Sequence, residues 1–282
     1  HRKNHKHQCN LDVQILKRAA NFLLERHSNK AEGDDDDNGD DFFQPIPPND
    51  DCSICTLPLP LGDMGTTYMS CCGNFICRGC SKEDKRVTLE RGLIERCAFC
   101  RVLLPSSEKE IMMRLQKRME LDDSVAIQTV SQCYRVGECG LPKDPQKAFD
   151  LCLRAAELGN SNACNSAASF YSDGVTVPTD MAKAREYFQK GVKGGDIASR
   201  HRLGMDEKRN GNFRLASRHW LISAAAGATD SLEEISKSYK FKLVTKNECS
   251  TAYTSNINVH KNEWSIERKA VMADVEVDSE RP

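Results

Sequence analysis

The stretch that decides the fold is DDCSICTLPLPLGDMGTTYMSCCGNFICRGC, residues 50–80, followed by CAFC at residues 97–100. The chain has 14 cysteines among 282 residues, and eight of them fall between Cys52 and Cys100. Because this density is local, we expect a local cause. Three of the four cysteine pairs have C-x2-C spacing, in which a tight turn presents two thiolates to one tetrahedral metal ion. The pairs are Cys52/Cys55, Cys71/Cys72, Cys77/Cys80 and Cys97/Cys100.

The alternative to metal binding is a disulfide framework. The first ten residues, HRKNHKHQCN, are polar and have no apolar core, so they do not read as a secretory signal. In a reducing compartment, clustered cysteines more often bind metal than form disulfides. Two closed tetrahedral zinc sites need eight thiolates, which is the number in this cluster, so we expect two structural zinc ions. Each site would contribute on the order of 10 kcal/mol to folding a segment that has almost no core of its own.

Composition limits the classes of partner. The 40 basic and 41 acidic residues balance, so no basic field is expected to draw the chain onto nucleic acid. No run approaches the roughly 18 apolar residues of a membrane span. We therefore expect a soluble intracellular protein, cytoplasmic or nuclear, that binds neither nucleic acid nor membrane. The sequence does not begin with Met, so we also expect that it can be a fragment.

Two segments precede the cysteine-rich region. Residues 1–30 begin with a polar stretch and continue with apolar side chains at helical spacing over 10–26, which is typical of a short amphipathic helix. Such a helix either packs on a neighbour or binds a partner. Residues 31–50 combine seven carboxylates between Glu32 and Asp41 with three prolines, and we expect them to be a disordered, solvated linker.

The cysteine-rich region is expected to span residues 51–105 and to lead into a connecting helix at 106–122. Ser107 and Glu110 have the spacing of a capping box at the start of that helix. An apolar stripe at i, i+4 and i+8 follows. Its members are Ile111, Leu115 and Met119.

Residues 123–270 repeat themselves, and a tail at 271–282 follows. The sequence of residues 134–163 aligns with that of residues 171–198, and Tyr134 and Tyr171 are 37 positions apart. A third copy at 200–231 is shorter by about four residues in its loop, and a fourth, the most degraded, begins at 232. Further matches between the first two copies are Asp144 with Asp180, Lys147–Ala148 with Lys183–Ala184, and Gly159 with Gly195.

A fixed period in the thirties, with alanine and glycine at matching places, indicates stacked helix pairs. Gly159, Gly195 and Gly227 stand where a helix would end in a left-handed cap. The pattern G-x-G-(V/L)…D…KA…AAxxG resembles the Sel-1-like repeat family, which is related to tetratricopeptide repeats. The resemblance is good for two copies, fair for the third and weak for the fourth. It implies a helical solenoid that binds other proteins.

The order of the cysteine pairs resembles that of a RING finger. This resemblance implies interleaved ligands, with the first and third pairs on one zinc ion and the second and fourth on the other. The expected fold class is therefore mainly α, a small zinc-stapled RING-like α+β module followed by an α-helical repeat solenoid. The implied ligand sets are Cys52, Cys55, Cys77 and Cys80 for one ion, and Cys71, Cys72, Cys97 and Cys100 for the other.

The RING resemblance also assigns contacts to three residues. Ile54, inside the knuckle CSIC, matches the apolar residue that RING ubiquitin ligases press against the conjugating enzyme. Phe99 lies in the other knuckle, CAFC. Arg101 directly follows the last cysteine and matches the "linchpin" arginine, which bonds both the conjugating enzyme and its ubiquitin. The simpler interpretation is that Ile54 and Phe99 cover a small core and that Arg101 is a solvated surface residue.

The chain departs from the common RING pattern in the sequence CCGNFIC. If Cys72 were the third ligand, Asn74 would occupy the usual histidine position, and a neutral amide is a poor zinc ligand. Taking Cys71 and Cys72 as consecutive ligands restores eight thiolates, as in all-cysteine RING variants, and we favour this assignment. In addition, the usual proline of the second loop is Ala98, and no Trp follows Cys80.

Three functions are weighed. The first is a RING-type ubiquitin ligase whose repeats select a substrate, an enzyme with no covalent intermediate and no catalytic side chain of its own. The second is a non-catalytic interaction scaffold with a structural zinc module, which Ala98 and the missing Trp favour. The third and weakest is nucleic-acid binding by the zinc module. Cys133, Cys152 and Cys164 fall on apolar helix positions of the repeats, where free cysteine is commonly buried. They belong to six scattered cysteines outside the cluster: Cys9, Cys133, Cys139, Cys152, Cys164 and Cys249.

Overall fold

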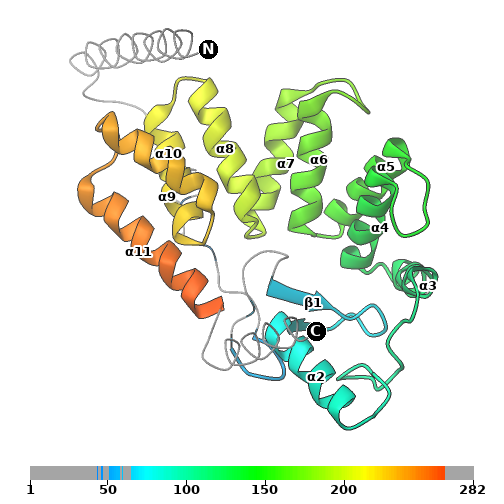
Figure 1. Cartoon of the computed structure of the whole chain (residues 1–282). Coiled ribbons are helices and arrows are strands. Elements are labelled where there is room, and N and C mark those ends of the chain that lie inside the picture. The colour runs from blue at the N-terminus through cyan, green and yellow to red at the C-terminus, as the bar shows by residue number, and fades with distance from the viewer. Residues whose placement is uncertain (1–42, 44–45, 47–50, 58, 60–64, 264–282) are drawn as a thin grey trace, which may run out of the picture. The chain divides into compact units, whose positions relative to one another are not determined.

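The computed structural model describes residues 43, 46, 51–57, 59 and 65–263 (Figure 1). The helix expected over 10–26, nearly all of the linker at 31–50 and the tail at 271–282 lie outside the described residues. Among those residues, no helix has both the length and the apolar character needed to cross a membrane.

The fold is mainly α, as expected, with one small sheet near the N-terminal end of the described chain. The elements of the cysteine-rich region and the connecting helix are β1 (Thr66–Tyr68), β2 (Phe75–Cys77), α2 (Arg78–Glu90) and α3 (Glu108–Met119). The helices that follow are α4 (Ser124–Val136), α5 (Pro145–Glu157), α6 (Ser161–Asp173), α7 (Met181–Lys193), α8 (Ile197–Arg209), α9 (Phe213–Ala225), α10 (Thr229–Lys240) and α11 (Lys246–Glu263).

A short hairpin organises the cysteine-rich region. β1 pairs antiparallel with β2, and Thr67 lies opposite Ile76. The turn between the strands is closed by the N–H of Met69, which donates to the carbonyl of Asn74 (2.9 Å). Gly73 stands in this turn with a φ of 80°, a left-handed conformation that glycine adopts without steric cost. The cysteine doublet therefore lies on the tip of a tight turn.

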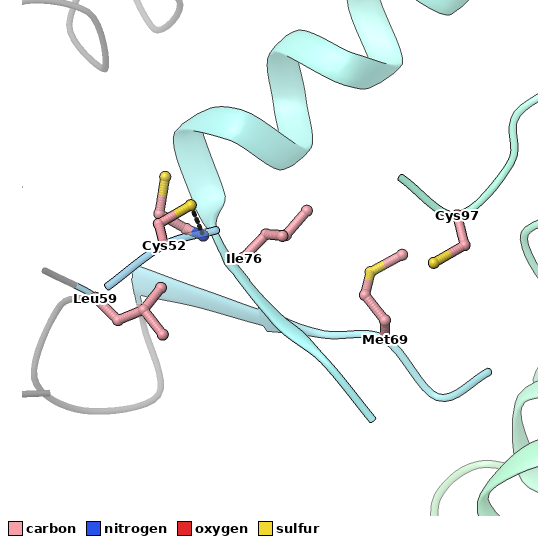
Figure 2. Close-up of a cluster of buried hydrophobic side chains, with 6 residues drawn as sticks. Cys52, Leu59, Met69, Ile76 and Cys97 are labelled. Atoms are coloured by element: carbon pink, nitrogen blue, oxygen red, sulfur yellow. Dashed lines mark hydrogen bonds between the residues drawn. The ribbon is translucent and has the colours of Figure 1, made fainter. Parts of the chain in front are cut away.

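The core of this region is small (Figure 2). Figure 2 shows Ile76 between two ends of the core, with Cys52 at the start of α2 and Met69 facing Cys97. Six buried residues form the cluster, and three of them are cysteines. A core this small cannot hold a domain of this size by apolar burial alone, so the cysteine sulfurs need a further stabilising contact. The buried residues are Cys52, Leu59, Met69, Ile76, Cys77 and Cys97.

The connecting helix α3 begins where the capping spacing predicts. Ser107 is its N-cap, and the Ser107 hydroxyl oxygen accepts from the N–H of Glu110 (3.3 Å). The return bond of a capping box differs, because the Glu110 carboxylate accepts from the N–H of Ser106 (3.0 Å) instead of that of Ser107. Leu115 is buried, and Ile111 and Met119 pack against the same cluster, so the apolar stripe is confirmed.

The left-handed glycines expected at the ends of repeat helices are confirmed. After α5, the N–H of Gly159 donates to the carbonyl of Ala156 (3.0 Å) and that of Asn160 donates to Ala155 (3.1 Å). This pair of bonds is the Schellman motif, which ends a helix and fixes the direction of the next one. The same bonds follow α7 at Gly195 and α9 at Gly227.

The positions that match between copies also match in their contacts. The N–H of Asp144 donates to the carbonyl of Tyr134 (2.8 Å), and that of Asp180 donates to Tyr171 (3.0 Å). Both aspartates are N-caps, of α5 and α7, and each accepts from the N–H three residues on (3.0 Å). The lysine at that third position holds its ammonium over the tyrosine ring in each copy. The sequence period therefore reflects one repeated set of contacts.

The third copy has the shorter loop that the sequence predicts. Seven residues, Gly174–Asp180, join α6 to α7, whereas three, Asn210–Asn212, join α8 to α9, a difference of four. Asn212 makes no side-chain cap bond to α9, and its Nδ2 donates to Glu207 Oε2 instead (2.7 Å). The helices of the repeats meet through small buried side chains and three buried cysteines, as expected. These are Cys133, Cys152 and Cys164, with Ala148, Ala155, Ala184 and Ala224.

Candidate metal centres

The structure brings the eight clustered cysteines together in two groups of four. Within each group, the four sulfurs all lie within 4.8 Å of one another. These groups are the interleaved sets that the RING resemblance implies, and each could hold a metal ion. One group is Cys52, Cys55, Cys77 and Cys80, and the other is Cys71, Cys72, Cys97 and Cys100.

Two of the cysteine pairs lie on knuckles with the same backbone geometry. In the first, the N–H of Thr56 donates to the carbonyl of Cys52 (2.8 Å), and in the second, that of Arg101 donates to Cys97 (3.0 Å). Thr56 and Arg101 both adopt left-handed backbone, with φ of 56° and 61°. Because non-glycine residues adopt this conformation at a cost, each knuckle needs a contact at its two sulfurs to stay closed.

The third pair uses the N-terminus of a helix. Cys77 is the N-cap of α2, and its sulfur accepts from the N–H of Cys80 (3.4 Å). The N–H of Cys77 in turn donates to the sulfur of Cys52 (3.4 Å; Figure 2). The helix N-terminus carries partial positive charge, which favours thiolates at this place.

The fourth pair is the doublet on the hairpin turn. Both thiols reach the second group, with Cys72 Sγ 3.7 Å from Cys97 Sγ and Cys71 Sγ 3.4 Å from Cys100 Sγ. Asn74, the residue at the histidine position of the common pattern, contributes its amide N–H to the sulfur of Cys72 (3.4 Å). In the structure Asn74 therefore acts as a donor to a sulfur of the group, and the group is complete without it.

The thiols of each group affect one another's ionisation. Burial raises the pKa of Cys52, but N–H groups of Cys77, Cys55 and Ile54 outweigh burial and lower that pKa to about 6. Burial also raises the pKa of Cys97, but backbone N–H groups outweigh burial there and lower that pKa to about 7.

Three other thiols of the two groups have raised pKa values. Burial, and then the neighbouring cysteines, raise the pKa of Cys80 and of Cys71 well above the usual range. Burial and Cys97 raise the pKa of Cys72 as well. In one group the thiolate of Cys52 is therefore favoured and that of Cys80 disfavoured, and in the other the thiolate of Cys97 is favoured and those of Cys71 and Cys72 are disfavoured. A bound cation removes this conflict, because it favours the thiolate form of all four sulfurs.

The three residues expected to contact a conjugating enzyme lie around these knuckles. Ile54 is 46% exposed between the two cysteines of the first knuckle. Arg101 is exposed after the second knuckle, and its carbonyl accepts from Arg96 Nη1 (3.1 Å). Phe99 is half-buried and packs against the core of the region, so at least part of its ring has a structural role.

One site of contact between the hairpin and the helices was not expected from the sequence. The hydroxyl of Tyr68 donates to Asp123 Oδ2 (2.7 Å), and Arg118 Nε and Nη2 donate to the same oxygen (2.8 and 2.6 Å). Burial raises the pKa of Asp123, but the bonds from Tyr68 and Arg118 outweigh it and lower that pKa. A Cβ at Gly73 would lie 2.7 Å from Arg118 Cζ. The glycine of the doublet turn therefore leaves room for this arginine.

Comparison with known proteins bears on the helical part. The family model of the Sel1 repeat matches residues 129–160 and 161–196. Among solved structures, the chain is similar to a Sel1 repeat protein from Oxalobacter formigenes, with a TM-score of 0.50 and 16% identity over 64% of this chain and 73% of that one. It is also similar to c5321, a protective antigen of uropathogenic Escherichia coli strains with an SLR fold (TM-score 0.48, 18% identity, 64% and 38% covered). Comparison with the curated proteins gives no match.

The fold and the cysteine groups define a class of protein, a helical repeat solenoid preceded by a cysteine-rich module with two potential metal centres. Residues 129–160 and 161–196 of the solenoid are matched as Sel1 repeats. The Oxalobacter formigenes protein shares this fold.

Proposed function

We propose that residues 51–105 form a two-zinc RING-type module and that the chain is a RING-type ubiquitin-protein ligase. In this proposal the module recruits a ubiquitin-charged conjugating enzyme, and the Sel1 repeats recruit a substrate or partner. The observation that carries the proposal is the interleaving of four cysteine pairs into two four-sulfur groups, with Ile54 exposed beside one group and Arg101 beside the other.

The spacing of the sulfurs supports zinc as the metal. Tetrahedral zinc with Zn–S bonds of about 2.3 Å requires its sulfurs to lie about 3.8 Å apart. Cys55 Sγ lies 3.8 Å from Cys77 Sγ, and Cys72 Sγ lies 3.7 Å from Cys97 Sγ. Four thiolates leave no open coordination position, so the metal would supply only folding free energy.

The proposed reaction requires no covalent step on this chain. Ile54 offers an apolar contact to the conjugating enzyme, and the Arg101 guanidinium holds the ubiquitin that is linked to that enzyme by a thioester. A substrate lysine amine then attacks the thioester carbonyl, an isopeptide bond forms, and the enzyme's cysteine thiol leaves. Arg101 contributes by limiting the orientations of the thioester, which is a positioning effect. Its left-handed backbone fixes where the side chain leaves the knuckle.

The test is ubiquitin-chain formation by the zinc-loaded chain with activating enzyme, ATP and a panel of conjugating enzymes. We expect chains with the wild type and a large loss in both Ile54→Ala and Arg101→Ala. Arg91→Ala is the matched control, because Arg91 is an exposed arginine of the same module outside the knuckles. Activity that survives Ile54→Ala and Arg101→Ala, with zinc content unchanged, would contradict the assigned contacts.

The second candidate is a non-catalytic scaffold in which the zinc module only mediates association. The packing of Phe99 against the core favours it, because a half-buried ring offers less surface to a conjugating enzyme than an exposed one. Ala98 and the absence of Trp between Cys80 and Cys97 favour it as well. No chains with any conjugating enzyme, from protein that holds two zinc ions, would support the scaffold instead of the ligase.

A further inference from the structure

A cavity of about 900 Å³ lies between the helices α4 and α6 and the hairpin β1–β2. Its wall is rich in amide and hydroxyl side chains, and Tyr68, Phe75 and Phe170 add aromatic surface. Nothing in the proposed ligase mechanism uses this cavity. We refer to it as the amide cavity, after the side chains of Gln128 and Asn165 that line it.

Two buried carbonyl oxygens of the amide cavity have no hydrogen-bond donor among the described residues. Gln128 is only 8% exposed, and its Nε2 donates to Ser166 Oγ (2.9 Å), while its Oε1 accepts no bond. Asn165 Oδ1 is likewise buried and accepts no bond. Gln132 Nε2 also donates to Ser166 Oγ (3.1 Å), so two amides of α4 bond the same hydroxyl of α6. A buried acceptor without a donor costs stability, which a ligand with N–H groups recovers.

Charged side chains also line the amide cavity. Arg135 and Lys143 line it, and both are exposed. Arg135 Nε donates to Gln132 Oε1 (2.8 Å), a bond that holds the guanidinium against the wall. The lining has a single carboxylate, Asp173, among the described residues, so cations outnumber anions there. The lining residues therefore combine unpaired amide acceptors with exposed positive charge.

A ligand that fits must donate N–H groups to Oε1 of Gln128 and Oδ1 of Asn165 and present negative charge to Arg135. An extended peptide meets both requirements, because its backbone offers an N–H at every residue and an acidic side chain pairs with arginine. A nucleic-acid backbone offers phosphate oxygens, which accept and do not donate, and so leaves the two carbonyls without donors.

We propose that the amide cavity binds an extended peptide segment with an acidic side chain. Backbone N–H groups of the peptide bond Gln128 and Asn165, and its carboxylate pairs with Arg135 and Lys143. This proposal rests on the proposed function in taking the repeats as the partner-binding part of the chain, and it names the class of partner. Since β1 and β2 complete the cavity wall, a bound peptide contacts the zinc module as well as the repeats.

The test selects a phage-displayed library of random ten-residue peptides on the full zinc-loaded chain and measures affinities of the enriched peptides by fluorescence anisotropy. We expect enriched peptides to contain Asp or Glu. Asn165→Leu and Arg135→Glu are each expected to weaken binding by about tenfold or more. Gln146→Leu and Arg209→Glu are matched controls on exposed positions of α5 and α8, and they should change affinity by less than about twofold.

Stability distinguishes a binding role from a structural one. Asn165→Leu removes an acceptor that lacks a donor, so we expect its melting temperature to equal or exceed that of the wild type while affinity falls. No enriched peptide, or enriched peptides that bind both variants as tightly as the wild type, would overturn the proposal. So would tight binding of a random RNA oligonucleotide that peptides do not displace.

The ligase test separates this proposal from the proposed function. Asn165→Leu should retain ubiquitin-chain formation, because the knuckles that would contact the conjugating enzyme are unchanged. Peptide binding that depends on Asn165, from a chain that forms no ubiquitin chains, would support the amide cavity and reject the ligase. Ubiquitin chains without any peptide binding would reject the amide cavity alone.

Discussion

The cysteine-rich region and the Sel1 repeats hold their folds together in different ways. In the first region, half of the buried core consists of cysteines, and eight sulfurs gather in two groups. In the repeats, helices meet through alanine and glycine, and helix ends are fixed by Schellman turns and aspartate caps. With the proposed zinc ions bound, the first region would depend on a few strong contacts to metal, whereas the repeats depend on many weak contacts spread along the chain.

This difference shows what each region can tolerate. A change at one sulfur affects the whole cysteine-rich region, because a site with three ligands leaves the remaining segment with little to stabilise it. A change in one repeat is buffered, since each repeat contacts mainly its neighbours. The bonds of Tyr68 and Arg118 to Asp123, together with the packing of Tyr68 on the cluster that contains Leu115 and Val130, link the two regions.

The largest expected effect comes from metal removal. A strong chelator should unfold residues 51–105 and leave the repeats folded, because each four-cysteine site contributes on the order of 10 kcal/mol and the repeats do not use it. We expect about eight additional thiols to react with a thiol reagent, while the thermal transition of the helices persists. Loss of that transition on chelation would show instead that the two regions fold as one unit through Asp123.

A smaller effect is expected from pH in the third repeat. Burial, followed by repulsion from Arg200, lowers the pKa of His219 from 6.5 to about 4, while Glu207 opposes this shift. Above pH 6.5 the imidazole of His219 is neutral in the folded and the unfolded chain, so its titration costs no stability. As the pH falls from 6.5 to 4, the unfolded chain binds a proton that the folded chain does not, and roughly 3 kcal/mol of stability is lost.

The measurement is urea unfolding of the wild type and His219→Gln at pH 7.5 and 4.5, followed by helical circular dichroism. The variant should lose less stability than the wild type between the two pH values. Loss of metal at low pH and the titration of His201 are common to both proteins and cancel in the comparison. An equal loss in both proteins would contradict the assigned role of His219.

The smallest expected effect tests close packing. Gly204 lies on α8, and a Cβ there would lie 2.8 Å from Cδ1 of the buried Trp220. Gly204→Ala should destabilise the repeats by roughly 1–2 kcal/mol, because forced movement of the ring outweighs the gain in helix propensity of about 1 kcal/mol. Arg209→Ala, on an exposed position of the same helix, is the control. If the cost is unchanged in a Trp220→Phe background, the contact with the ring is not its cause.

Much of the site follows from the sequence because its information is local. A C-x2-C pair places two sulfurs on one turn, and a fixed period places a glycine after α5, α7 and α9. The link from Tyr68 to Asp123 joins residues 55 positions apart, so no local pattern predicts it. The amide cavity was missed for the same reason, since its walls come from α4, α6 and the hairpin.

Two smaller differences have local causes. The sequence gives no sign that Arg101 adopts left-handed backbone, because glycine is the usual signal for that conformation and arginine is not. The return bond to Glu110 comes from the N–H of Ser106, the first of two serines that precede the helix, and the capping spacing does not distinguish these serines.

The measurement that tests the account most directly is the metal content of the purified full chain by native mass spectrometry. Two zinc ions per chain are expected for the wild type. Cys77→Ser and Cys97→Ser should each lower the count, since these cysteines belong to different groups, whereas Cys152→Ser, a buried cysteine of the repeats, should leave it at two. A wild-type chain without zinc, or with a count that neither cluster variant changes, would contradict the account.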